Sequence, residues 1–442
     1  MPRLAKIEAL CSPSQDLGRM LLTVQSYLGE MYVKKILFIM GSYFPKPSAN
    51  GICVHQLIKE CYQRDYEITV LTTNIEDLKK EESTQYVEII RIDDDPLLKT
   101  MKRNAIYSKV AKIFNKALVL FRTIKKYNVS SERANELTKN ALKIIKEKQI
   151  DIVVSVVQPI ETFYIIPVLK KHFSNVNYTC YFLDIPNEKQ IKPKFINDLW
   201  QKRSLELYNE VFPHCDVIFT MESTRKYFEN LFTDNFEKKL IYVDIPLFHK
   251  TEVKANQLKY KFKDSTRKNI VFTGTLYEKI RDPRGVLSVF QEVYKHYKSF
   301  TIHFYGSGCE DVLQNYVNIF GDSLCIHGRV NLDEAYWAIN EADLLLNISN
   351  VTDYQIPSKI FEYFATGKPI INYRFRSNDP ANKYYDKYPN LLNIDGWEEQ
   401  KYTREIIDFI ESSTELEDKS KLSELFARNT PKYVVDVLDK YL

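Results

Sequence analysis

The chain has 442 residues, which is too long for one ordinary hydrophobic core and enough for two α/β domains. Hydrophobic residues make up 44% of the chain and charged residues 27%, which excludes a disordered or fibrous protein. The 62 basic and 58 acidic residues leave a formal net charge of only +4, so the concentrated basic surface of a nucleic-acid-binding protein is not expected. We therefore predict two globular domains and no nucleic acid partner.

The first half of the chain alternates short apolar runs with segments of helical periodicity. Residues 34–41 are an apolar run that ends in glycine, which is typical of the first buried strand of a doubly wound sheet. A helix over residues 51–64 and a strand over 67–72 complete a β-α-β unit. Further strands are predicted at 87–92, 152–157, 178–183, 217–221 and 240–243. We expect residues 34–247 to form a Rossmann-like domain with a mainly parallel sheet.

A polar, lysine-rich stretch at residues 250–268 interrupts this pattern and suits a connection between domains. A second series then follows, with a helix over 284–297 and strands at 269–275, 300–305, 324–327, 344–347 and 369–373. Residues 248–430 are expected to form a second Rossmann-like domain of the same α/β class. The last helical segment, residues 431–442, is long enough to pack back on the N-terminal domain.

The N-terminal residues, the apolar runs and the cysteines indicate the cellular location of the protein. Residues 1–33 are interpreted as an N-terminal extension, poorly ordered or helical, because residues 1–30 lack the continuous apolar segment of a secretory signal. No apolar run approaches the roughly 18 to 20 residues that a membrane-spanning helix needs. The seven cysteines are scattered without a Cys-x-x-Cys motif, so we interpret them as reduced, mostly buried thiols. A cytoplasmic location is expected.

The most informative segment is residues 355–371, with the sequence QIPSKIFEYFATGKPII. Its Pro-Ser pair before an amphipathic run predicts a helix N-terminus that Ser358 caps or opens, and Gly367 ends the helix. Backbone N–H groups at such an end attract anions, and Lys359 adds a full positive charge. Glu362 lies one turn further on, where its carboxylate can accept hydrogen bonds from both hydroxyls of a ribose. A capped helix with solvated charges explains the same pattern.

This segment resembles the C-terminal domain of retaining glycosyltransferases of family 4 and its relatives, which have the GT-B architecture of two Rossmann-like domains facing each other across a cleft. The resemblance implies a nucleoside diphosphate sugar as donor substrate, retention of configuration, no cofactor and no protein-bound metal. It aligns Glu362 with the second glutamate of the family pair, which holds the nucleotide ribose. The first glutamate, which contacts the donor sugar, falls on Tyr354, so this chain departs from the pattern there, and Asp353 is the adjacent substitute.

A second match lies at the first strand of the C-terminal domain. Gly274 followed by Arg281 resembles the glycine and the basic residue with which the family grips the donor phosphate, and a guanidinium forms bidentate contacts with a diphosphate. Thr275 stands where the family often has a basic residue, and Lys279 and Arg284 are nearby substitutes. Ordinary surface charges in a loop are the alternative interpretation.

Further glycines resemble the lining of the family's nucleotide pocket, because glycine lets the backbone approach a ligand closely. Gly306 belongs to the strand end HFYGSG, and Val330 closes the strand end HGRV. In the N-terminal domain, Gly51 heads the helix after the loop 43–51, which occupies the position of the family's first glycine-containing loop. A β-α turn that needs a flexible residue explains Gly51 equally well.

Two acids follow predicted strands of the N-terminal domain, at the edge where open α/β sheets bind ligands. Asp184 follows the strand 178–183, and we identify it as the candidate catalytic residue that orients the acceptor hydroxyl. Glu222 follows the strand 217–221 in the same way. A helix-capping role is the alternative for Asp184, and Glu222 is similarly ambiguous.

Two other segments invite functional interpretations. The aspartates at 93–95 resemble the Asp-x-Asp metal motif of the other main glycosyltransferase fold, but they lie in a loop of the acceptor domain, and we predict no metal site. Residues 99–126 contain many Lys and Arg and no acid, interleaved with apolar residues. As a helix they would either contact anionic lipid at the inner face of the plasma membrane or pack on the sheet as a solvated helix.

Together these features predict a cytoplasmic glycosyltransferase that moves a sugar from a nucleotide sugar to a lipid-linked or saccharide acceptor, in surface polysaccharide or glycolipid synthesis. Arg281, Lys359 and the helix N-terminus would stabilise the charge on the departing diphosphate. Tyr354 favours a rival interpretation, a noncatalytic nucleotide-sugar-binding scaffold. A nucleotide-sugar epimerase of the same fold is a third, although no set of carboxylates or histidines deep in the cleft is identified for it.

Overall fold

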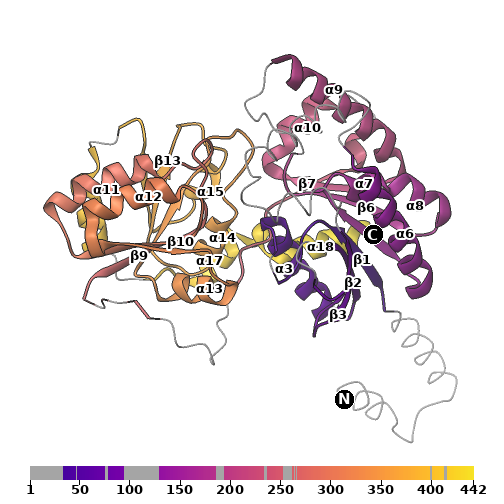
Figure 1. Cartoon of the computed structure of the whole chain (residues 1–442), viewed down its shortest axis with the longest axis horizontal. Helices are drawn as coiled ribbons and strands as arrows, with labels where there is room; N and C mark the ends of the chain where they lie inside the picture. The colour runs from indigo at the N-terminus through magenta and orange to yellow at the C-terminus, as the bar shows by residue number, and fades with distance from the viewer. Residues whose placement is uncertain are drawn as a thin grey trace, which may run out of the picture.

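Two α/β domains, each built on one sheet, make up the protein (Figure 1). The computed structural model describes residues 33–45, 47–74, 78–93, 129–185, 194–232, 236–251, 261–262, 264, 266–398, 401–412 and 416–442. Four predictions concern residues that lie wholly or partly outside these ranges, namely the N-terminal extension up to residue 32, the aspartates at 94 and 95, the basic segment 99–126 and the connection 250–268.

The N-terminal sheet has the strand order β3-β4-β2-β1-β5-β6-β7-β8 among the described residues, and only β3 is antiparallel to its neighbour. Its strands are β1 (Lys35–Met40), β2 (Glu67–Asn74), β3 (Glu81–Ser83), β4 (Glu88–Asp93), β5 (Ile152–Val156), β6 (Asn177–Phe182), β7 (Val217–Met221) and β8 (Leu240–Val243). The predicted strands are confirmed. The sequence did not predict β3, because this edge strand has three exposed polar residues and no apolar alternation.

The C-terminal sheet is parallel, with the order β11-β10-β9-β12-β13-β14 in the described part of the chain. Its strands are β9 (Lys268–Thr275), β10 (Phe300–Ser307), β11 (Leu324–Gly328), β12 (Leu344–Ile348), β13 (Ile370–Arg374) and β14 (Leu391–Asp395). The edge strand β14 was not predicted. In both sheets the strand order reverses beside the first strand, between β1 and β5 and between β9 and β12. Open α/β sheets bind ligands at such switch points, outside the carboxyl ends of the strands.

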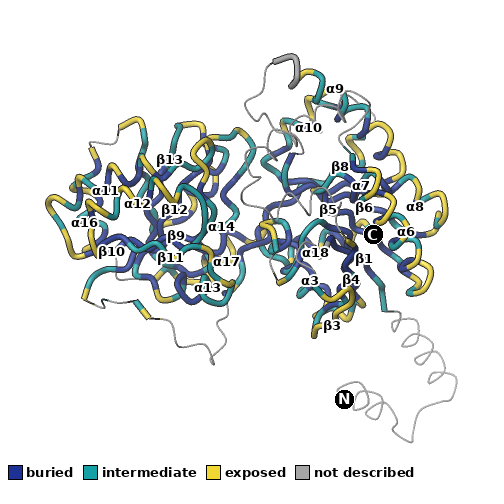
Figure 2. The backbone as a smooth tube through the Cα atoms, viewed as in Figure 1, coloured by how far each residue is buried: buried dark blue, intermediate teal, exposed yellow. Residues whose placement is uncertain are grey.

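Helices cover both faces of the N-terminal sheet, which is why its central strands are apolar throughout (Figure 2). Along β1, Phe38 and Met40 face α3 (Ala49–Gln63), whereas Leu37 and Ile39 face the opposite layer. That opposite layer consists of α6 (Ser131–Lys148), α7 (Glu161–Tyr164), α8 (Ile166–His172), α9 (Lys194–Val211) and α10 (Arg225–Leu231).

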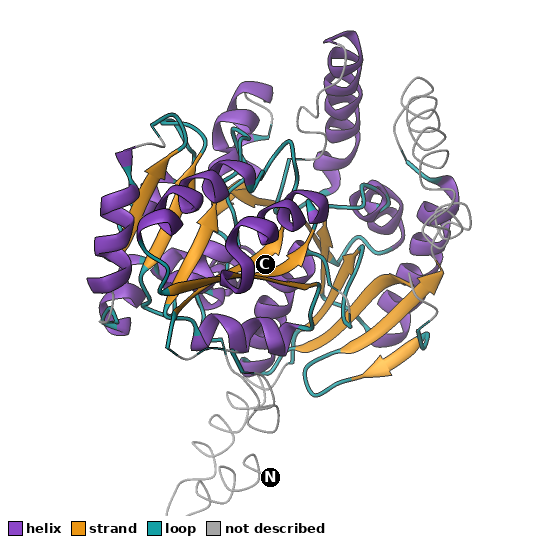
Figure 3. Ribbon diagram, turned by 60° about the vertical axis from the view of Figure 1, so that its left-hand side comes forward, coloured by secondary structure: helices purple, strands orange, loops and turns teal. Residues whose placement is uncertain are grey.

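The C-terminal sheet is also sandwiched between two helical layers (Figure 3). One layer consists of α11 (Arg284–His296), α12 (Glu310–Phe320) and α16 (Thr403–Ser412). The other consists of α13 (Leu332–Glu341), α14 (Lys359–Phe364), α15 (Asn382–Tyr385) and α17 (Lys419–Leu425), and its core is continuous with that of the N-terminal domain. None of the helices in the described ranges combines the length and the apolar character that a membrane span requires.

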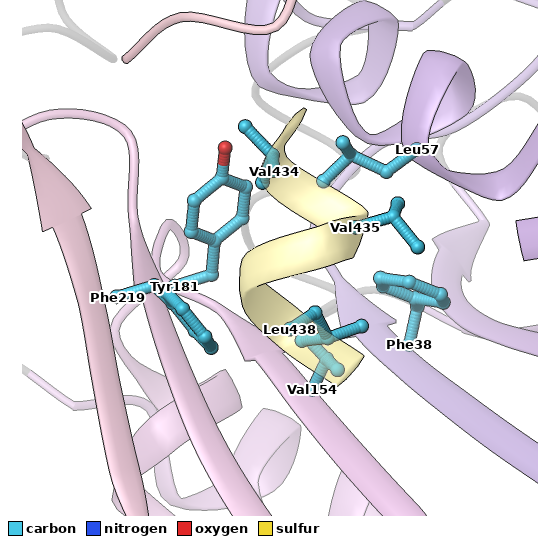
Figure 4. A pocket seen from close by; sticks show the side chains of 8 residues that line it. All are labelled: Phe38, Leu57, Val154, Tyr181, Phe219, Val434, Val435 and Leu438. Atoms are coloured by element: carbon cyan, nitrogen blue, oxygen red, sulfur yellow. The ribbon is translucent and has the colours of Figure 1, made fainter. Parts of the chain in front are cut away.

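The last helix, α18 (Pro431–Tyr441), leaves the C-terminal domain and packs beside α3 on the N-terminal sheet (Figure 1). Its Val434, Val435 and Leu438 line a small apolar cavity of about 20 Å³ between the helix and the sheet (Figure 4). Arg64, at the end of α3, pairs with Asp436 at 2.7 Å and with Asp439 at 2.8 Å. The end of the chain is therefore attached to the N-terminal domain by apolar packing and by ion pairs.

Candidate functional site

The candidate donor site lies at the carboxyl ends of the C-terminal strands, where glycines allow β9 and β10 to approach each other closely. Gly274 has φ +148° and Gly306 has φ +151°, values that favour glycine. A Cβ on Gly306 would lie 1.7 Å from the carbonyl oxygen of Gly274. Gly306 is therefore required by strand packing whether or not a ligand is bound. With Gly328 these two glycines line a small cavity of about 20 Å³.

Arg281 lies beside Gly274 and carries a largely buried positive charge. Its Nε donates to Asn350 Oδ1 at 3.1 Å, and its Nη1 donates to the carbonyl oxygen of Thr275 at 3.5 Å. Burial lowers the pKa of the Arg281 guanidinium, which nevertheless remains charged at pH 7. Within the described ranges no carboxylate pairs with Arg281. An anionic ligand at the end of β9 would supply the missing counter-charge.

The other cations near this strand end are placed differently. Arg284 is half-exposed and pairs with Asp282 at 2.6 Å and with Glu278 at 3.9 Å. Lys279 is exposed. Arg284 is thus already neutralised by acids on its own loop, and Arg281 is the better candidate to bind a phosphate.

The helix predicted to begin at Ser358 begins there but is shorter than predicted. α14 spans six residues and begins directly after Ser358, which makes no capping hydrogen bond. Of its two predicted roles, Ser358 therefore opens the helix and does not cap it. The reason is that the chain already turns at Pro357, whose carbonyl oxygen accepts from the N–H of Ile360 at 3.1 Å, which places Ser358 inside the turn. The helix ends at Phe364, and Gly367 lies in the following turn with φ +78°.

Glu362 is fully buried, and in the described part of the chain three polar groups lie near its carboxylate. Lys359 Nζ lies 2.5 Å from Oε2, Tyr336 OH donates to Oε1 at 3.2 Å, and His249 Nε2 lies 3.9 Å from Oε1. A carboxylate offers about four acceptor positions, so capacity for further hydrogen bonds remains. Because no part of Glu362 is exposed, a ribose can reach it only if side chains around it move.

The N-terminal domain presents Asp184 and Cys53 to this region. Asp184 directly follows β6, and burial raises the pKa of its carboxyl to about 6. The Cys53 thiol on α3 is buried, and its pKa is raised first by burial and then by the carboxylates of Glu362 and Asp184. The charges of Glu362, Asp184 and Lys359 all act on this thiol, so these three predicted residues lie in the surroundings of Cys53.

Histidines near this region were not predicted. His55 on α3 bonds to Tyr43 OH through Nδ1 at 2.7 Å, and burial, with the charges of Lys59 and His249, lowers its pKa to about 3. His249 lies in the interdomain connection, and burial lowers its pKa. Its Nε2 is buried without a hydrogen-bond partner in the described part of the chain. His55 follows Gly51 by one helical turn, which is the available signal, whereas no periodicity marks His249.

Residue 51 must be glycine for a structural reason that does not involve a ligand. A Cβ at this position would lie 2.6 Å from the carbonyl oxygen of Ser42, so the loop before α3 can close over the helix only if residue 51 is glycine. The N–H of Gly51 donates to Ser48 Oγ at 3.2 Å, which caps the helix. This bond occupies the Gly51 donor that a ligand would otherwise use.

The position of the family's first glutamate carries no available acid. The Tyr354 ring lies 6.0 Å from the ring of Tyr227 on α10, across the two domains. Asp353, the adjacent substitute, is largely exposed and pairs with Arg376 at 2.5 Å. Recognition of a donor sugar by a carboxylate at this place would require that ion pair to open.

The remaining candidates have structural partners. Glu222 pairs with Arg225 at 2.7 Å, and this hydrogen bond is the main cause that lowers the pKa of Glu222. Val330 is partly buried and packs against the core shared by the two domains. Asp93, the described member of the aspartate run, is exposed and lies 3.5 Å from Lys80.

Residues 267–383 match the family described as Glycosyl transferases group 1. A search of the curated proteins found no match. Similar solved structures include TarM (10% identity, 93% of this chain and 99% of that chain, TM-score 0.60). Another is Anabaena Alr3699/HepE in complex with UDP (10% identity, 92% of this chain and 100% of that chain, TM-score 0.57). A third is a glycosyltransferase from Rickettsia africae ESF-5 (12% identity, 92% of this chain and 98% of that chain, TM-score 0.55). The fold is GT-B, and the predicted resemblance to glycosyltransferases is confirmed.

Proposed function

We propose that this chain, which has the GT-B fold and a C-terminal domain matching glycosyl transferases group 1, transfers a sugar from a nucleoside diphosphate sugar to an acceptor hydroxyl. The observation that carries the proposal is Arg281, a largely buried cation with no carboxylate partner in the described residues, beside the glycines at the ends of β9 and β10. A diphosphate has the charge and the geometry that a guanidinium binds best. The UDP complex of the Anabaena neighbour supports a nucleoside diphosphate in this fold.

The charges of the site fit the departure of a diphosphate. As the bond between the anomeric carbon and the diphosphate oxygen breaks, negative charge develops on the leaving group. Arg281 and Lys359 stabilise that charge, and fixed donors act most strongly where charge develops. Lys359 now contacts Glu362 at 2.5 Å, so its movement to the diphosphate would also release a carboxylate oxygen for the ribose hydroxyls.

Asp184 is the residue that we assign to the acceptor. Its pKa of about 6 leaves it mostly ionised at pH 7 and close to the range in which a carboxylate accepts a proton efficiently. It orients the acceptor hydroxyl toward the anomeric carbon. Configuration is retained, with no protein nucleophile and no protein-bound metal in the reaction, as the resemblance implies.

The acceptor is a growing surface polysaccharide or a glycolipid, and the reaction takes place in the cytoplasm. A lipid-linked acceptor would bring the protein to the inner face of the plasma membrane, where the basic residues 99–126 would contact anionic lipid. Flotation with neutral and anionic liposomes tests this contact, because only anionic liposomes should carry the protein.

A second candidate function is a noncatalytic scaffold that binds a nucleotide sugar. Two observations favour it: the family's first glutamate is replaced by Tyr354, and Asp353 is held by Arg376.

Mass spectrometry of UDP-, GDP- and ADP-sugars, incubated with and without candidate acceptors, separates the functions. Glycosylated acceptor together with free nucleoside diphosphate supports the transferase, and its loss in Arg281→Ala but not in Arg284→Ala ties it to the proposed site. A nucleotide sugar that binds but is never consumed indicates the scaffold. Conversion of the donor into its epimer without any acceptor indicates an epimerase.

A further inference from the structure

Three side chains with metal-binding atoms meet at the edge of the C-terminal sheet. His303 lies on β10, and Cys325 and His327 lie on the edge strand β11. One ligand atom from each of the three lies within 4.8 Å of the others. His303 Nδ1 is 3.0 Å from His327 Nε2. The cluster follows from the strand pairing, because His303 is the register partner of Cys325, and residues two apart on a strand share a face.

The ring of His303 is held in the orientation that leaves one nitrogen for a metal. Its Nε2 lies 3.0 Å from Asn269 Oδ1. The amide orientation of Asn269 is fixed by its Nδ2, which donates to Asp343 Oδ2 at 3.3 Å and to the carbonyl oxygen of Arg267 at 3.2 Å. Nε2 of His303 therefore carries the proton, and Nδ1 presents a lone pair toward His327. Metal-binding histidines are oriented by this kind of outer hydrogen bond.

Aromatic packing holds both imidazole rings. The His327 ring stacks on Tyr305 with ring centres 3.9 Å apart and an angle of 3°. The His303 ring lies 4.6 Å from Phe262, which in turn lies 4.9 Å from Trp337 on α13. His303 is buried, Cys325 is partly buried and His327 is exposed. One side of the cluster is thus rigid, and the other is open to an ion arriving from solvent.

We propose that His303, Cys325 and His327 bind a zinc ion, with water as the fourth ligand. Two imidazoles bound to a tetrahedral zinc at about 2.0–2.1 Å have nitrogens roughly 3.3 Å apart, close to the observed separation of 3.0 Å. A thiolate with two imidazoles selects zinc over magnesium or calcium, which prefer oxygen ligands. The ion fastens the edge strand β11 to β10. This role is separate from the proposed sugar transfer and needs no activity measurement to test it.

Cobalt(II) is the probe that reports on each ligand. The full-length chain is freed of metal by chelator and dialysis and is then titrated with cobalt chloride, followed by zinc chloride. We expect a thiolate-to-cobalt charge-transfer band that saturates at one ion per chain, disappears on addition of zinc and does not form with magnesium. The band should be absent in Cys325→Ser and unchanged in Cys309→Ser, since Cys309 is also partly buried in the same domain but lies outside the cluster.

Thermal unfolding provides a second readout that does not depend on the thiolate. Zinc should raise the Tm of the wild type, because a ligand that binds only the folded state stabilises it. It should not raise the Tm of His327→Ala, whose exposed side chain can be removed without opening the core. Asn269→Ala should weaken zinc binding about 10- to 100-fold. A missing thiolate band, an undiminished band in Cys325→Ser, or an equal Tm increase in His327→Ala would overturn the proposal.

Discussion

The two domains present different chemistry to each other. The C-terminal side carries full charges, with Arg281 at the end of β9 and the buried pair of Lys359 and Glu362 on α14. The N-terminal side disfavours charge, since burial raises the pKa of Asp184 and lowers that of His55. The two domains therefore suit different parts of the two substrates. A charged diphosphate fits the first side, and a neutral acceptor hydroxyl fits the second.

Burial alone does not produce this difference. Glu362 is completely buried, but Lys359 lies 2.5 Å away and compensates its charge. Asp184 has no ion-pair partner in the described part of the chain, and desolvation is the cause that raises its pKa. Glu362 thus has a cation beside it, whereas Asp184 has none among the described residues.

The largest effect is expected for a substitution at the close backbone contact between Gly306 and Gly274 in the C-terminal domain. Gly306→Ala would place a Cβ 1.7 Å from the carbonyl oxygen of Gly274, so we expect the free energy of unfolding to fall by about 3–5 kcal/mol. Urea denaturation measures the change. Gly321→Ala is the matched control, because Gly321 also has a positive φ of +56° but no atom within 4 Å of an added Cβ. Equal losses in the two variants would show that backbone strain, and not strand contact, is the cause.

The next effect concerns the charge on the C-terminal side. Arg281→Ala should weaken binding of a nucleoside diphosphate about 100-fold, since hydrogen bonds to charged groups contribute about 1.5–3 kcal/mol each. Binding of the uncharged nucleoside should change little, so the ratio of the two affinities isolates the phosphate contact. Arg284→Ala serves as control because Asp282 already pairs with Arg284. If both variants bind the nucleoside diphosphate like the wild type, Arg281 does not bind the diphosphate, and the proposed role of the C-terminal side is contradicted.

A smaller effect is expected on the N-terminal side, where Asp184 should make stability depend on pH. Its folded pKa of about 6 exceeds the usual unfolded value of about 3.9, so between these values the folded state binds more protons. The wild type should thus lose stability relative to Asp184→Asn as pH rises from 4 to 7, by on the order of 1–2 kcal/mol, and remain level above pH 7. Urea denaturation of both proteins at pH 4.5 and 7.5 measures the difference. An identical difference at the two pH values would contradict the raised pKa.

The smallest effect concerns the helix that links the two sides. Arg64→Ala removes ion pairs to Asp436 and Asp439 on α18, and since all three side chains are partly exposed, we expect a loss of about 1 kcal/mol in stability. Lys143→Ala is the control, because its pair with Glu147 is exposed and lies within a single helix. A fall in Tm in the first variant alone indicates that α18 is anchored through Arg64.

The sequence predicted the architecture well where apolar runs are long. The strands β1 and β9 are buried on both faces, so their composition alone identifies them. The edge strands β3 and β14 were missed, because a short edge strand needs little apolar surface and the run Leu391–Asp395 is mostly half-buried. The pairing of an edge strand depends on the backbone groups of the neighbouring strand, and the local sequence pattern does not predict it.

The site was predicted only in part. The contact between Lys359 and Glu362 follows from their spacing of three residues on one helix. The approach of His249 to Glu362 joins the interdomain connection to α14, and such long-range packing leaves no periodic signal. The Cys325-x-His327 spacing was present on a predicted strand, but its meaning depends on His303 in the neighbouring strand.

We propose that the C-terminal side binds the nucleoside diphosphate of the donor, with Glu362 holding its ribose. Calorimetric titration of UDP, GDP and ADP into the wild type, Glu362→Gln and Glu222→Gln tests it most directly. We expect that one nucleotide binds the wild type, binds Glu362→Gln about 10- to 100-fold more weakly, and binds Glu222→Gln normally, because Glu222 is held by Arg225. No binding of any nucleotide to the wild type, or equal affinities for the wild type and Glu362→Gln, would contradict it.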